Sequence, residues 1–116
     1  MKLAIWTLAL VSLAGCTTPT MNEMRQEEPR QVLHSKKADK VVAECVQHQW
    51  QDMPVFEGHS GATLERGLKG GYTVATVNSA YFADIQAEGG ATVIKYYAAT
   101  YRWISRKHLS AMEGCL

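Results

Sequence analysis

The chain has 116 residues, of which 47% are apolar and 20% are charged. This length is enough for one domain with a single hydrophobic core and too short for two cores or a multi-step catalytic architecture. Lysine and arginine together number 12, and aspartate and glutamate 11, so no basic excess indicates a nucleic-acid partner and no acidic block indicates a disordered, solvating tail.

The first 15 residues have the pattern of a secretory signal peptide. Lys2 supplies one positive charge, and residues 3–14 form an apolar run that is interrupted only by Thr7 and Ser12. A run of this length is too short to span a bilayer, which needs about 20 apolar residues. We therefore expect residues 1–15 to be a targeting segment and not part of the fold.

The apolar run ends in Leu13-Ala14-Gly15-Cys16, which resembles the lipobox of bacterial lipoproteins. In that family the cysteine receives a diacylglyceryl thioether, the leader is cut before it, and the new amino group is usually acylated. The resemblance implies that Cys16 is the lipidated first residue of the mature chain. The alternative is an ordinary secreted protein that is cut near Gly15 and keeps a free thiol.

A lipid anchor holds a protein to a membrane without a transmembrane helix. Two or more acyl chains do so stably, because each buried methylene contributes about 0.8 kcal/mol. In Gram-negative lipoproteins an aspartate after the lipidated cysteine typically causes retention in the inner membrane, and this chain has Thr17 there. The resemblance therefore implies the outer membrane, with the domain facing the periplasm. Removal of Lys2 leaves 12 − 1 = 11 basic against 11 acidic side chains, so we expect no attraction to anionic lipid.

Residues 16–35 are expected to be the lipidated cysteine followed by a flexible tether. This segment is polar, contains proline and has few aromatic or β-branched side chains. It cannot bury enough apolar area to offset the entropy that ordering would cost. The alternative is a short helix over 21–28 that docks through Met21 and Met24, because glutamate, glutamine, arginine and methionine favour helices.

Residues 36–116 are expected to form a small α+β domain that begins with a helix. Ser35 is a suitable N-cap, apolar residues follow at helical spacing on one face, and Pro54 ends the helix. Residues 55–71 are rich in glycine, and we expect a loop there with at most a short strand.

From Tyr72 onward the apolar period changes from helical to alternating. Three alternating runs cover 72–77, 81–87 and 91–98, and Gly89-Gly90 between the last two predicts a tight hairpin. Residues 101–112 again show helical spacing. The predicted fold is therefore an N-terminal helix, a three- to four-stranded antiparallel sheet and a C-terminal helix, with both helices on one sheet face.

With Cys16 assigned to lipid, Cys45 and Cys115 remain in a compartment that permits disulfides. One cysteine is expected on each of two helices that share a face of the sheet, so we predict a disulfide between Cys45 and Cys115. Its closed loop of about 71 residues corresponds to about 4 kcal/mol of stabilisation. A zinc site that also uses His48 and His108 fits no known spacing pattern. We predict neither a metal nor another cofactor.

No residue pattern in the chain predicts catalysis. Ser60 stands in only half of a G-x-S-x-G motif. Asp84 and Glu88 are expected at water-facing strand and turn positions. A nucleophile built from Cys45 and His48 would need a thiolate of low pKa in a cleft, whereas a cysteine on the apolar face of a helix is more often structural. We therefore predict that the protein is not an enzyme.

Aromatic residues crowd the end of the last alternating run. Alternation places Tyr96 and Tyr97 on opposite faces of the sheet, and Tyr101, Arg102 and Trp103 follow. Aromatic side chains beside arginine are enriched in interface hot spots, so Tyr97, Tyr101 and Arg102 form a candidate interaction surface. The alternative is that Tyr96 packs under a helix while Tyr97 covers the other face.

The mature chain also resembles, as a whole, a group of small proteobacterial envelope lipoproteins. Their shared features are a helix ending in Cys-x4-Trp, a Gly-Tyr strand, a Tyr-Tyr strand, a late tryptophan and a final cysteine. In this chain they correspond to Cys45 to Trp50, Gly71-Tyr72, Tyr96-Tyr97, Trp103 and Cys115. The group brings no activity with it, so the resemblance implies the fold and the disulfide only.

Together these patterns predict a noncatalytic, lipid-anchored envelope protein that acts as an interaction or accessory module for a periplasmic or outer-membrane component. The expected partners are the membrane, through the lipid anchor, and an envelope protein, but not nucleic acid. The alternative from a different class is an inhibitor of a secreted enzyme such as lysozyme. Such an inhibitor would insert a loop, for instance residues 60–71, into an active site.

Overall fold

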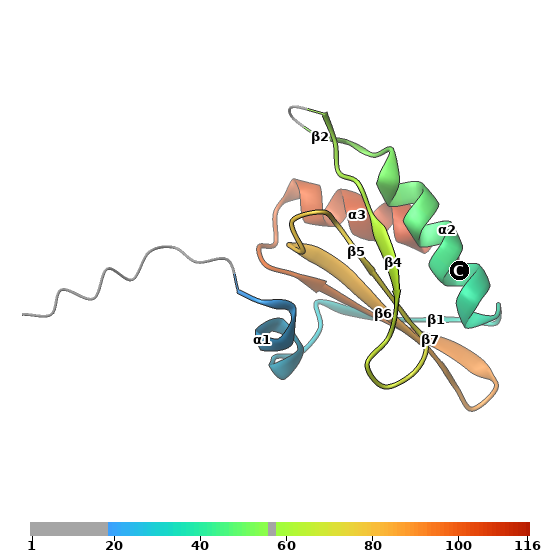
Figure 1. The fold of residues 1–116 in the computed structure, drawn as a ribbon. Helices are drawn as coiled ribbons and strands as arrows, with labels where there is room; N and C mark the ends of the chain where they lie inside the picture. Colours follow the sequence, from blue (N-terminus) through green and yellow to red (C-terminus); the bar gives the residue numbers. More distant parts are fainter. Residues whose placement is uncertain (1–18, 56–57) are drawn as a thin grey trace, which may run out of the picture.

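The computed structural model describes residues 19–55 and 58–116 of the chain (Figure 1). The expected signal peptide and the expected lipidation at Cys16 lie outside the described residues. In chain order the elements are α1 (Met21–Gln26), β1 (Gln31–Ser35), α2 (Asp39–Gln51), β2 (Pro54–Val55), β3 (Gly58–His59), β4 (Thr63–Arg66), β5 (Tyr72–Ala75), β6 (Tyr81–Glu88), β7 (Ala91–Ala98) and α3 (Trp103–Glu113). None of the described helices is long and apolar enough to cross a membrane.

Most of the described strands form one antiparallel sheet in the order β1-β7-β6-β5-β4. β2 and β3 pair with each other in a separate ribbon. The predicted α+β class and antiparallel sheet are confirmed. Within the described part of the chain the main sheet has five strands instead of three to four, because β1 and β4 lie in segments that the sequence pattern assigns to a tether and a loop.

β1 lies at one edge of the sheet beside β7 and corrects the expected tether over residues 16–35. Leu33 packs against the main core and Ser35 is buried, whereas Val32 and His34 on the other face are exposed. An edge strand with only one covered face has a polar composition although it belongs to the fold. Composition alone therefore misassigns this segment.

α1 is the short helix that the sequence gives as the alternative to a tether. Thr20 caps it, since its Oγ1 accepts a hydrogen bond from a backbone N–H of the first turn at 3.2 Å. Met24 is buried against Phe82 and Tyr97 on the sheet. The domain expected over residues 36–116 therefore begins earlier, at α1.

The segment over 55–71, expected to be mainly loop, contains β4 and most of the β2–β3 ribbon. β4 pairs with β5, and Leu64 is its one partly buried residue, with exposed neighbours on both sides. A four-residue edge strand of this kind has no alternating apolar run, which explains why the pattern does not predict it.

α2 and α3 cover one face of the main sheet, as predicted, and α1 lies on the opposite face (Figure 1). Trp50 is fully buried, and its indole N–H donates to the carbonyl of His108 at 2.9 Å. The hydroxyl of Tyr96 donates to the carbonyl of Ser105 at 2.7 Å, and burial raises the pKa of this tyrosine. The polar atoms of this core are thus matched to helix carbonyls.

Two local predictions around the sheet have different outcomes. α2 begins at Asp39 with Ala38 as its N-cap, so the expected cap at Ser35 is wrong. Ser35 instead ends β1. The hairpin between β6 and β7 is confirmed, with Gly89 and Gly90 at φ +57° and +83°. Two successive positive φ angles fit the turn type that matches the twist of the flanking strands.

Candidate functional site

Cys45 and Cys115 form a disulfide that joins α2 to the residue after Gly114 at the end of α3. Their Cα atoms are 5.8 Å apart, and Cys115 is almost completely buried. The predicted pairing is confirmed. Because both sulfurs are bonded to each other, neither acts as a zinc ligand or as a thiolate nucleophile in this state. Among the described residues, no group of three or more metal-ligating side chains comes together.

Ser60, which is partly buried, and His108, which is fully buried, form a serine–histidine pair that brings two distant segments together. The Oγ of Ser60 lies 2.7 Å from Nε2 of the imidazole, and Nδ1 lies 2.8 Å from the carbonyl oxygen of Ile104. Because a carbonyl only accepts, Nδ1 carries the hydrogen and Nε2 of the neutral ring accepts from the serine hydroxyl. Burial lowers the pKa of His108, which favours this neutral form.

This pair has the distance of a nucleophile and its base, but its surroundings fit a structural link. An acyl-transfer site needs backbone N–H groups aimed at a developing oxyanion. The N–H of Ser60 donates to Met53 at 2.9 Å, and the N–H of Gly61 donates to Gln51 at 3.2 Å. Both amides nearest the hydroxyl are therefore engaged. The hydrogen bond fastens the segment before β4 to α3.

The structure divides the predicted aromatic surface between two faces. Tyr97 is only 6% exposed, because its ring stacks on Phe82 at 4.7 Å and Met24 of α1 covers it. Its place in the predicted interaction surface is therefore wrong. The alternative arrangement is observed, with Tyr96 under the helices and Tyr97 covering the other face.

Tyr101 and Arg102 do lie on the surface, in the connection from β7 to α3. Tyr101 is 50% exposed and Trp103 is 46% exposed. The guanidinium of Arg30 lies 5.7 Å from the centre of the Tyr101 ring, within the range of a cation–π contact. These residues form one exposed aromatic and basic patch.

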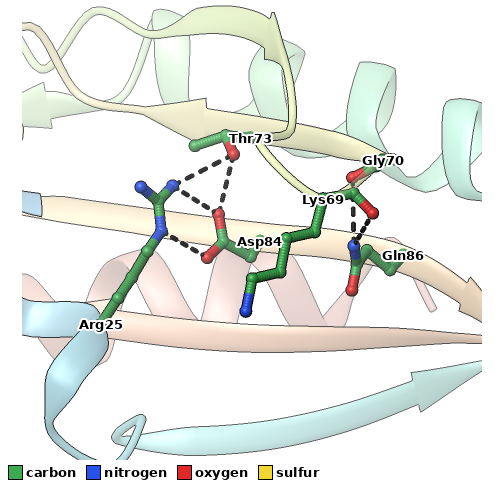
Figure 2. Close-up of polar contacts among 6 residues, drawn as sticks. All are labelled: Arg25, Lys69, Gly70, Thr73, Asp84 and Gln86. Atoms are coloured by element: carbon green, nitrogen blue, oxygen red, sulfur yellow. Dashed lines mark hydrogen bonds and ion pairs between the residues drawn. The ribbon is translucent and has the colours of Figure 1, made fainter. Parts of the chain in front are cut away.

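A polar trough lies on the sheet face that α1 only partly covers. Its centre is Asp84 of β6, whose carboxylate accepts hydrogen bonds from Nε and Nη2 of Arg25 at 2.7 and 2.8 Å (Figure 2). The hydroxyl of Thr73 on the neighbouring strand donates to the same carboxylate at 2.8 Å. The hydrogen bonds that Arg25 donates to Asp84 raise the pKa of Arg25, so its guanidinium stays protonated.

The loop between β4 and β5 forms the opposite wall of the trough. The side-chain amide of Gln86 donates to the carbonyl oxygens of Lys69 and Gly70 at 2.8 and 3.2 Å, which fixes the loop on the sheet (Figure 2). Between this loop and α1 lies a hollow of about 200 Å³ whose lining includes Arg25, Asp84 and Lys95. The trough is thus bounded on both sides by hydrogen-bonded segments.

The trough carries positive charge that its own carboxylate does not balance. Lys95 lies directly across the strand pair from Asp84, yet Asp84 is paired with Arg25. Within the described residues, Lys69 and Lys95 form no ion pair. Two exposed ammonium groups therefore line the same hollow as a neutralised pair. This arrangement suits an anionic group of a ligand or partner.

Comparison with family models, with curated proteins and with solved structures finds no match for the chain. The functional argument therefore depends on the geometry of its own residues. The residues that the sequence analysis did not predict as a site are Arg25, Lys69, Lys95 and the pair of Ser60 with His108. Each depends on contacts between distant segments, and no local motif marks them.

Proposed function

We propose that the protein is a noncatalytic lipoprotein of the bacterial outer membrane that faces the periplasm and binds another envelope protein. The lipobox-like sequence before Cys16 supports the anchor. The disulfide between Cys45 and Cys115 supports an oxidising compartment, since such bonds persist outside the cytoplasm. The proposed role is that of an interaction or accessory module.

The observation that carries the binding role is the trough between α1 and the β4–β5 loop. It combines a hollow, two unpaired ammonium groups at Lys69 and Lys95, and a rim residue, Leu68, that is 79% exposed. A carboxylate-bearing segment would meet complementary charge, and an apolar side chain beside it would cover Leu68. We therefore propose an acidic segment of an envelope protein as the occupant.

The noncatalytic role is supported by how the reactive side chains are used. Both cysteines of the domain are bonded to each other, and the hydroxyl of Ser60 is held by His108 with its neighbouring amides engaged. Asp84, which could have served as an acid or base, is paired with Arg25 and Thr73. Each group thus has a structural partner.

The binding role is tested by photo-cross-linking in intact envelopes with the lipid anchor retained. A photoreactive p-benzoylphenylalanine replaces Leu68, and we expect irradiation to give a discrete adduct with one envelope protein. The combined substitutions Lys69→Glu and Lys95→Glu should abolish this adduct. The control, Lys40→Glu on the exposed surface of α2, should leave it unchanged. An adduct that survives the charge reversal at the trough contradicts the proposal.

The anchor is tested separately by labelling with radioactive palmitate. The wild-type chain should incorporate label and fractionate with the outer membrane, whereas Cys16→Ser should do neither. A wild-type protein that remains unlabelled and soluble contradicts the proposed location, whatever the cross-linking experiment gives.

A second candidate function is the inhibition of a secreted enzyme such as lysozyme, and the β4–β5 loop favours it. Gly67 donates to Gly71 across the base of the loop at 3.0 Å, and Gln86 holds its far side, while Leu68 projects into solvent. A loop fixed in this way loses little entropy when it enters a cleft. Inhibition of muramidase activity by the domain, lost on Leu68→Ala, would favour this function over the first.

A further inference from the structure

The covalent chain leaves little distance between the proposed lipid anchor and the folded domain. Thr20 caps α1, so the first regular element begins at Met21. Four peptide bonds join Cys16 to Thr20, and an extended chain spans at most about 3.6 Å per residue, which limits this distance to about 14 Å. With the acyl chains of Cys16 in the bilayer, the first turn of α1 must therefore lie close to the headgroups.

Two other segments lie at the same end of the sheet as the start of α1. Pro19 and Thr20 share one hollow with Asn78 and Ser79 of the β5–β6 turn. Pro19 also shares a hollow with Ala98 and Ala99 at the end of β7. The β5–β6 turn and the end of β7 are hydrogen-bonded to each other, since the N–H of residue 99 donates to the carbonyl of residue 80 at 2.7 Å. We call residues 19–20, 76–80 and 98–103 the anchor end; Figure 1 shows them together at one end of the strands.

The anchor end exposes apolar and aromatic side chains. Val77 is 76% exposed, Tyr101 is 50% exposed and Trp103 is 46% exposed. Arg102 lies between these two aromatic residues in the sequence and is exposed, and the guanidinium of Arg30 lies over the ring of Tyr101. Tryptophan and tyrosine are enriched at membrane–water interfaces, and arginine can bury its stem while its charge remains at the headgroups. This combination is typical of a surface that rests on a bilayer.

We infer that the anchor end docks on the phospholipid surface, with Tyr101 and Trp103 in the interfacial region. The inference rests on the proposed lipidation of Cys16. A bilayer is favoured as the binding partner of this surface because the short connection from Cys16 to Thr20 holds the surface next to the bilayer in every molecule. Docking is therefore effectively intramolecular. Glu27 and Glu28 close to Arg30 give the region charges of both signs. Insertion of the rings, and not attraction to anionic lipid, therefore stabilises the contact.

This orientation places the trough one short strand length from the anchor end. The four residues of β5 separate the β4–β5 loop from the anchor end, a length of about 14 Å at 3.4 Å per residue. The β4–β5 loop lies beside Ile85 and Gln86 part-way along β6, and the β6–β7 hairpin lies at the far end of these strands (Figure 1). Docking through Tyr101 and Trp103 would thus hold Leu68 and Lys69 just above the headgroups, where a periplasmic partner could reach them.

The intrinsic fluorescence of the chain provides the test. Of its three tryptophans, Trp6 lies in the leader, Trp50 is fully buried and Trp103 is exposed. The mature lipidated protein, which begins at Cys16 and so lacks Trp6, is reconstituted into phosphatidylethanolamine–phosphatidylglycerol vesicles that contain lipid brominated near the upper part of the acyl chain. We expect bromine to quench part of the emission and Trp103→Phe to remove the quenched part, because Trp50 is shielded by the core. The same result is expected in uncharged phosphatidylcholine vesicles.

A matched tryptophan at the other end of the domain serves as the control. Val41 on α2 is 52% exposed and follows the end of β1 that lies opposite the start of β7. In the Trp103→Phe background, Val41→Trp should therefore remain unquenched. Suppose that the protein is labelled by palmitate and binds the vesicles. The inference is then overturned, and the anchor is not, if Trp103 is unquenched or if the tryptophan introduced at position 41 is quenched to the same extent. A protein that is neither labelled nor bound overturns both.

Discussion

Arg25 of α1 and Asp84 of β6 are separated by 59 residues in sequence and joined by two hydrogen bonds, at 2.7 and 2.8 Å. Their side chains are 21% and 24% exposed. Together with the packing of Met24, this pair holds α1 on the sheet. It also forms one wall of the trough, so the stability of α1 and the shape of the candidate site are coupled.

We predict a measurable coupling between these two residues. Arg25→Ala and Asp84→Ala should each lower the free energy of unfolding by about 1–3 kcal/mol, because each leaves a partly buried charge without its partner. The double-mutant cycle, measured by urea denaturation, should give a coupling energy of about 1–2 kcal/mol. The exposed pair of Lys40 and Glu44 is the control, with an expected coupling below about 0.5 kcal/mol. Equal coupling in the two cycles would show that Arg25 does not fix α1.

The disulfide should account for a large part of the stability of the domain. Cys45→Ser combined with Cys115→Ser should lower the free energy of unfolding by about 2–5 kcal/mol, because the unfolded chain is no longer cross-linked over 70 residues of sequence. Guanidinium denaturation gives the value. The wild-type protein in reductant should behave like the double variant. Two alkylatable thiols in the nonreduced wild-type protein would contradict the prediction.

The parts of the fold that the sequence predicts are those with a local signal. β6 and β7 have eight residues each and contain aromatic and β-branched residues, and Gly89-Gly90 between them permits the positive φ angles of a tight turn. β1 has no such signal, because a short edge strand covers one face through Leu33 and leaves Val32 and His34 in water. Its place in the sheet depends on pairing with β7, which lies at the other end of the domain sequence.

The candidate site shows the same division. The pairing of Cys45 with Cys115 follows from the number of cysteines and the expected compartment, so the sequence predicts it. The pairing of Arg25 with Asp84 depends on α1 crossing the sheet, which no periodicity indicates. Tyr97 is assigned to the surface for the same reason, since the helix that covers it is read as a tether.

A single methyl group at Gly71 should be strongly destabilising. This residue has φ +69°, and a Cβ would collide with the carbonyl oxygen of Ile85 on the neighbouring strand. Gly71→Ala should lower the free energy of unfolding by about 2–4 kcal/mol, which combines backbone strain with the displacement of β5. Gly70→Ala is the control, because it has φ +90° but open space around the added atom, and it should cost about 1 kcal/mol. Equal effects in thermal or urea denaturation would show that the close approach is not what requires glycine.

The domain should lose stability in mild acid through His108. Burial lowers the pKa of this histidine in the folded protein, whereas the unfolded chain has a pKa near 6.5. The unfolded state therefore binds the proton more tightly, so the stabilisation is complete above about pH 6.5 and is lost as the pH falls through the folded-state pKa. The charged ring would also face Lys107 on its own helix.

Urea denaturation at a series of pH values between about 7.5 and 5 measures this effect. We expect the free energy of unfolding of the wild-type protein to fall as the pH is lowered across this range, and that of His108→Asn to vary much less. The variant should be less stable at every pH, because the hydroxyl of Ser60 loses its hydrogen-bond acceptor. His48→Asn is the matched control, since this exposed histidine lies on the surface of α2. It should retain the wild-type pH dependence. Folding opposes the protonation of a buried, neutral imidazole, so the pH dependence should depend on His108. A pH dependence that persists in His108→Asn and disappears in His48→Asn would contradict its assignment to His108.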